Sequence, residues 1–134
     1  MNFTRGTFLA LKGVVNVDGP AALNAIQALE QAMCGGPVVT QFVGGAPAEV
    51  PERYRQGALT GLLPTGAAQI FLVQAEAGPE WTALIEPHVE TARKAGDPAR
   101  MEILKGRGHF DGIDPQAQDW SVVLAAVQSL VRAR

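Results

Sequence analysis

The sequence has little charge and a single cysteine. Charged residues make up 18% of the 134 residues, and the formal net charge is -2 at pH 7. Such a chain offers phosphate groups no basic field, so nucleic acid is excluded as an expected partner. Because Cys34 is the only cysteine, neither an intramolecular disulfide nor a cysteine metal cluster can form. We therefore expect no metal, no cofactor and a cytoplasmic location.

Long apolar runs are also missing. Lys12 cuts short the apolar stretch near the N-terminus, and no small-residue cleavage site follows, so this stretch does not resemble a signal peptide. No run approaches the length of about 20 residues that a membrane span needs, and we expect no membrane partner. The chain is 47% hydrophobic, which is enough to build a core, and its length favours one domain over residues 1–134.

Three short segments have the composition of buried strands. They are residues 14–17, which end at a turn with Asp18, the continuous apolar run 69–73, and residues 101–104. A continuous apolar run is typical of a parallel strand that is covered on both faces. Segments 14–17 and 69–73 are separated by proline- and glycine-rich sequence that predicts irregular structure over 44–66, with a short helix at 52–56.

Helical patterns follow each of these strands. The first starts near Asp18 and Pro20 and runs to Met33; the second carries Trp81 and ends near Gly96, with a kink or restart at Pro87; the third is opened by Asp114 and Pro115 and carries Trp120. Strand and helix therefore alternate. This alternation predicts an α/β fold of three layers, with a small parallel sheet between flanking helices.

Four segments, taken in order, resemble the C-terminal half of an α/β-hydrolase of the esterase and kynurenine formamidase type. They are residues 42–54, 63–64 ahead of the second strand, 95–98, and the Gly-x-Gly-His-Phe-Asp-x-Ile-Asp-Pro element at 106–115. The last is the most specific. The resemblance implies that the fold corresponds to the C-terminal part of the α/β-hydrolase fold. It also implies that His109 stands where that family has its catalytic base.

The other two catalytic groups of that family have no clear counterpart. A gapless match puts Ala77 where the family has its catalytic aspartate, and Glu76 and Glu80 are the nearest possible substitutes. The Gly-x-Ser-x-Gly nucleophile turn is echoed only faintly by residues 2–6, with Thr4 at the serine position. We therefore expect His109 to be a vestigial base and the chain to hydrolyse nothing by itself.

The remaining candidate residues have simpler interpretations. His88 is expected on the surface, and Trp81 and Trp120 in the core. Cys34 is interpreted as a small packing residue at a helix end, the alternative being a thiol nucleophile paired with His109. Asp111 and Asp114 are expected to hold turns or a helix start rather than a metal.

Three functional hypotheses remain open. The first is a non-catalytic, hydrolase-like fragment that acts by binding or self-association. The second is one half of a split esterase or amidase, in which His109 joins a site completed by a partner chain with the serine. The third is a degenerate product without activity. In the complete fold the strand at 14–17 has a neighbour that this chain lacks, so its open edge predicts a two-fold homodimer. The alternative is that the residues before Phe8 fold back and cover this edge within one chain.

Overall fold

A three-stranded parallel sheet forms the centre of the protein. The computed structural model describes residues 11–74, 78–106, 108 and 110–132. The strands are β1 (Gly13–Val17), β2 (Ala68–Gln74) and β3 (Ala99–Leu104), in the spatial order β1-β2-β3. All three predicted strands are confirmed. β2 lies in the middle, and six of its residues are buried with an exposed fraction of at most 7%, which explains its apolar run at 70–73.

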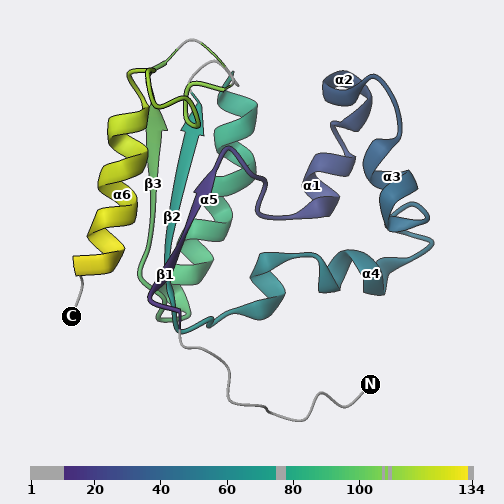
Figure 1. Cartoon of the computed structure of the whole chain (residues 1–134). Coiled ribbons are helices and arrows are strands. Elements are labelled where there is room, and N and C mark those ends of the chain that lie inside the picture. The colour runs from purple at the N-terminus through teal and green to yellow at the C-terminus, as the bar shows by residue number, and fades with distance from the viewer. Residues whose placement is uncertain (1–10, 75–77, 107, 109, 133–134) are drawn as a thin grey trace.

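Two long helices cover opposite faces of this sheet, as Figure 1 shows. Helix α5 (Gly78–Lys94) packs on one face, where Phe71 and Val73 join Ile85 in one hydrophobic core. Helix α6 (Trp120–Arg132) packs on the other face, where a second core includes Leu72 of β2. The predicted α/β class, with a small parallel sheet between flanking helices, is confirmed at this level.

The segment between β1 and β2 contains five short helices. They extend the first core beyond α5, on the side away from α6. They are α1 (Leu23–Gln27), α2 (Glu30–Cys34), α3 (Val38–Val43), α4 (Pro51–Gln56) and the 3₁₀ helix η1 (Leu59–Leu62). The predicted short helix at 52–56 is confirmed as α4.

Two predicted helix boundaries were wrong. The single helix that should have reached Met33 is divided into α1 and α2, and this break turns the chain so that the Glu30 carboxylate accepts the backbone N–H groups of Val39 and Thr40 at the start of α3. Helix α6 begins at Trp120 rather than near Asp114. Asp114 instead holds a turn, because its Oδ1 accepts the N–H of Gln116 at 2.9 Å.

Trp81 is buried, as predicted, but Trp120 is only half-buried. This part of the prediction was wrong because Trp120 lies at the very start of α6, where the helix enters the core. Helix α5 does not restart at Pro87 but continues through it. Within the described ranges, no helix is long and apolar enough to cross a membrane.

Candidate functional site

The carboxyl ends of β2 and β3 form the edge at which ligand sites of open α/β sheets lie. The predicted base His109 lies outside the described residues, as do Ala77, Glu76 and Thr4. Glu80, the other possible acid, is exposed in the first turn of α5. Of these five residues, Glu80 alone is among those that the structure describes.

Two carboxylates hold the turn that follows β3. Asp119 is 2% exposed and accepts the backbone N–H groups of Lys105 and Gly106, at 3.2 and 2.8 Å. Asp111 accepts the N–H of Gly108 at 3.1 Å. These bonds confirm the expected turn role of Asp111. Because both carboxylates accept backbone N–H groups, they help to shape the turn after β3.

Gln74, at the end of β2, was not singled out in the sequence, and its amide nitrogen lies near Gly112. Its side chain is 2% exposed, yet neither atom of its amide has a hydrogen-bonding partner in the part of the chain that the structure describes. Its backbone N–H donates to Oδ1 of Asp18 at 2.9 Å. A buried, unpaired amide is uncommon in native proteins. It marks the end of β2 as a place where a polar group from outside the described residues can bind.

The prediction for His88 was wrong, because this histidine is buried in the interface between α5 and β2. It is 4% exposed, and its ring lies edge-on to Phe71 with 5.3 Å between ring centroids. Nε2 is 2.8 Å from Oε1 of Gln69, and Nδ1 is 3.2 Å from Oγ1 of Thr60. Burial lowers the pKa of His88 below its usual 6.5, although the carboxylate of Asp97 opposes this shift.

Asp97 completes this network at the amino ends of the strands. Its carboxylate accepts the N–H groups of Thr65 and Gly66, at 2.6 and 2.9 Å, and Nε2 of Gln69 at 3.0 Å. These bonds, the Thr65 N–H first, hold the pKa of Asp97 below its usual range. Each of these polar groups has a partner within the protein, so the network is suited to hold η1, β2 and α5 together rather than to react.

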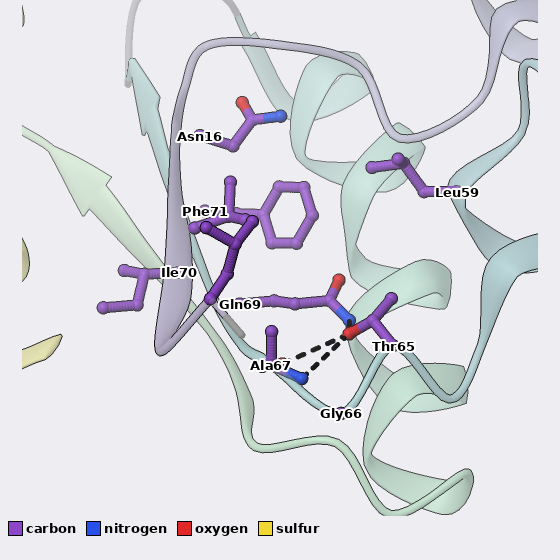
Figure 2. A pocket seen from close by; sticks show the side chains of 10 residues that line it. Asn16, Leu59, Thr65, Gly66, Ala67, Gln69, Ile70 and Phe71 are labelled. Carbon is purple, nitrogen blue, oxygen red and sulfur yellow. Dashed lines mark hydrogen bonds between the residues drawn. The ribbon is translucent and has the colours of Figure 1, made fainter. Parts of the chain in front are cut away.

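A cavity of about 450 Å³ lies beside this network, and Figure 2 shows Gln69 and Thr65 pointing toward one another at one end of it. Most of its lining is apolar. The lining residues are Leu11, Val14, Asn16, Leu59, Thr65, Gly66, Ala67, Gln69, Ile70 and Phe71. Since Leu11, Val14 and Asn16 belong to β1 or precede it, this cavity lies next to the edge of the sheet.

Cys34 does not have the packing role that its sequence position predicted. It is a free and exposed thiol at the end of α2. Its possible pairing with His109 falls outside the described residues. Among the residues that are described, no three histidine, cysteine or acidic side chains are arranged to hold a metal ion.

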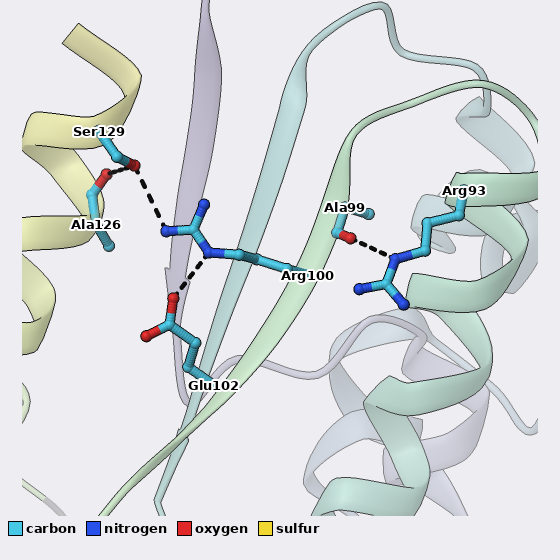
Figure 3. Close-up of polar contacts among 6 residues, drawn as sticks. All are labelled: Arg93, Ala99, Arg100, Glu102, Ala126 and Ser129. Atoms are coloured by element: carbon cyan, nitrogen blue, oxygen red, sulfur yellow. Dashed lines mark hydrogen bonds and ion pairs between the residues drawn. The ribbon is translucent and has the colours of Figure 1, made fainter. Parts of the chain in front are cut away.

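The two outer edges of the sheet differ in how they are protected. At β3, Nε of Arg93 donates to the backbone carbonyl of Ala99 at 2.6 Å, and Arg100 forms an ion pair with Glu102 at 2.7 Å (Figure 3). Charged side chains of this kind block strand pairing. The strand β1, Gly13–Val17, contains no charged residue and no proline, and within the described residues it pairs with β2 alone.

Exposed apolar side chains surround the outer edge of β1. Val14 is 48% exposed on the strand, and Val127 and Val131 of α6 are 44% and 68% exposed. A shallow depression next to this edge is lined by Lys12, Gly13, Val127, Leu130 and Val131. We call this surface, formed by the outer edge of β1 with Val14, Val127 and Val131, the β1 edge surface.

Comparison of the chain with protein-family models, with curated proteins and with solved structures found no match in any of the three.

Proposed function

We propose that this chain is an α/β-hydrolase-like domain that hydrolyses no ester or amide by itself and acts through self-association at the β1 edge surface. The observation that carries the proposal is the contrast between the two sheet edges. β3 is blocked by Arg93 and by the Arg100–Glu102 ion pair, whereas β1 has neither a charge nor a proline on its strand. An apolar strand edge with unpaired backbone groups is a template for pairing with another chain.

The serine residues support the non-catalytic part of the proposal. The chain has two serines, Ser121 and Ser129, and both lie within α6. Their hydroxyl groups donate to backbone carbonyls of Gln118 and Ala126, at 3.1 and 2.7 Å. A serine nucleophile of the α/β-hydrolase type lies instead on a sharp turn from a strand into a helix. Neither serine has this setting.

A second candidate function is favoured by the unpaired amide of Gln74. In this version, a partner chain with a serine nucleophile docks at the carboxyl ends of β2 and β3, and His109 serves as the base of the joint site. Gln74 would then supply a hydrogen bond to a group that the described residues lack.

The exposed thiol of Cys34 fits a reducing compartment, and for either function we propose the cytoplasm as the location of the protein.

Two proline variants test the self-association of the full chain. Proline at Val15 removes an N–H that points away from β2, and Ile103→Pro removes the corresponding N–H on the outer side of β3. Proline is tolerated at such edge positions but prevents further strand pairing. Light scattering at micromolar concentration should give a dimer for the wild type and for Ile103→Pro, and a folded monomer for Val15→Pro. A monomeric wild type would overturn the proposal.

A further inference from the structure

The backbone of β1 alternates in direction, and the hydrogen bonds at its two ends fix which residues point outward. The carbonyl of Lys12 accepts the N–H of Ala68 at 3.2 Å, and the N–H of Asp18 donates to the carbonyl of Leu72 at 2.8 Å. In a parallel ladder both backbone groups of every second residue point to the same neighbour. The even-numbered residues of β1 therefore face β2. Gly13, Val15 and Val17 present their N–H and C=O groups at the outer edge.

We infer that a second copy of this chain pairs with β1 in antiparallel orientation, with the two-fold axis at Val15. This inference rests on the self-association proposed above and specifies its register. In this register Val15 faces Val15 of the second copy, and Gly13 faces Val17. Each such pair exchanges two hydrogen bonds in an antiparallel ladder. All the outward groups of β1 are then satisfied, whereas a two-fold register centred on any other residue of β1 leaves some of them unpaired.

The charges that flank β1 agree with this register. It places Lys12 near Asp18 of the second copy at both ends of the paired strands, just beyond the last hydrogen-bonded pairs, where Asp18 leaves the strand with a φ of 57°. Between them the strand is uncharged. In the monomer, Nζ of Lys12 reaches the carbonyl of Val131 at 3.1 Å and Asp18 accepts the N–H of Gln74. Charge pairs of this kind add little affinity but strongly disfavour a wrong register.

The apolar side chains around β1 also become covered in this arrangement. Because the axis stands perpendicular to the joined sheet, helix α6 of each copy lies on the same face, and the exposed Val127 and Val131 face the other copy. On the opposite face, Val14 lies beside Asn16 of the second copy and adds a wall to the cavity that both residues line. The register thus covers apolar surface on both faces of the sheet.

Charge reversal provides the test. Lys12→Asp and Asp18→Lys each place like charges at both ends of the homodimer, which should raise its dissociation constant at least about tenfold. Mixed in equal amounts, the two variants restore opposite charges at both ends, so native mass spectrometry should find the mixed dimer. Lys94→Asp, an exposed residue at the end of α5, is the matched control and should leave the dimer unchanged.

Cysteine cross-linking supports the test if a charge variant folds poorly. On a Cys34→Ser background, Val14→Cys mixed with Asn16→Cys should form a disulfide between copies, because non-hydrogen-bonded partners lie at a distance that a disulfide spans. Failure of both the charge complementation and this cross-link, in a wild type that is dimeric, would overturn the register alone. A wild type that stays monomeric would overturn the register and the proposed function together.

Discussion

Nε2 of His88 lies 2.8 Å from Oε1 of Gln69, and the amide nitrogen of the same glutamine lies 3.0 Å from Oδ2 of Asp97. Since the glutamine nitrogen donates to the carboxylate, its oxygen is left to accept from the imidazole. Neutral His88 therefore donates through Nε2 and accepts from Thr60 through Nδ1. These hydrogen bonds connect α5 to the amino ends of β2 and β3. They require a neutral imidazole, because Nδ1 must accept a hydrogen bond.

The lowered pKa of His88 predicts a stability change near neutral pH. The unfolded chain binds a proton near pH 6.5, while the buried ring binds one only at lower pH. The stability that the neutral His88 ring contributes is therefore fully present above about pH 6.5. It falls as the pH drops toward the lowered pKa. Urea unfolding at pH 7.5, 6.5 and 5.5 should show this fall, and His88→Gln should reduce its slope. Equal slopes for both proteins would contradict the buried, neutral histidine.

Glu30 predicts a second pH effect in a separate, more acidic range. Its carboxylate accepts the hydroxyl of Thr40 and the N–H groups of Val39 and Thr40, and these bonds, the hydroxyl first, lower its pKa below 4.5. The stability they contribute is present above pH 4.5 and is lost as the pH falls through the lowered pKa. Glu30→Ala should lower the denaturation midpoint at pH 7 more than Glu90→Ala, whose carboxylate is exposed. Similar midpoints would argue against this role.

The core packing predicts a clear contrast between two leucines. Leu72 of β2 is fully buried against Leu104 and α6, whereas Leu62 of η1 is 58% exposed. Leu72→Ala should lower the free energy of unfolding by about 2–5 kcal/mol. Leu62→Ala should change it by no more than about 0.5 kcal/mol, as is usual at the surface. Chemical denaturation of both variants measures the difference, and equal effects would mean that the second core is misassigned.

We also expect no hydrolysis of esters or amides by the isolated chain. Chromogenic short-chain esters should be turned over no faster by the wild type than by His109→Ala, and a serine-reactive fluorophosphonate should leave the intact mass unchanged. The hydroxyls of Ser121 and Ser129 donate to the backbone carbonyls of Gln118 and Ala126. Turnover that His109→Ala abolishes, or a fluorophosphonate adduct, would reveal a nucleophile and contradict the non-catalytic assignment.

The strands and long helices were predicted well from the sequence, because burial of these elements requires local patterns of apolar residues that the sequence shows. Residues 70–73 are all apolar since α5 and α6 cover both faces of β2. The burial of His88 could not be predicted from a local pattern. Its burial depends on Thr60 and Gln69, which lie 28 and 19 residues away in the chain. The start of α6 was misplaced because Asp114 and Pro115 form an acceptable helix start locally, while Asp119 is held by the turn after β3.

The candidate site was predicted only as a location. The Gly-x-Gly-His element does follow β3, but Gln74 could not be recognised in the sequence, because an amide at a strand end becomes unusual only when the fold buries it without a partner. An open edge at β1 is predicted from the resemblance, and within the described residues β1 pairs with β2 alone. Its contrast with β3 depends on Arg93, which reaches Ala99 from the end of α5 and which no strand pattern could indicate.

Amide hydrogen exchange, measured residue by residue at increasing protein concentration, tests the central claim most directly. The N–H groups of Val15 and Val17 point away from β2, whereas those of Val14 and Asn16 are expected to bond to it. If β1 pairs with a second copy, exchange at Val15 and Val17 should slow as the concentration rises, while Val14 and Asn16 stay protected throughout. Fast exchange at Val15 and Val17 at every concentration would contradict self-association through β1.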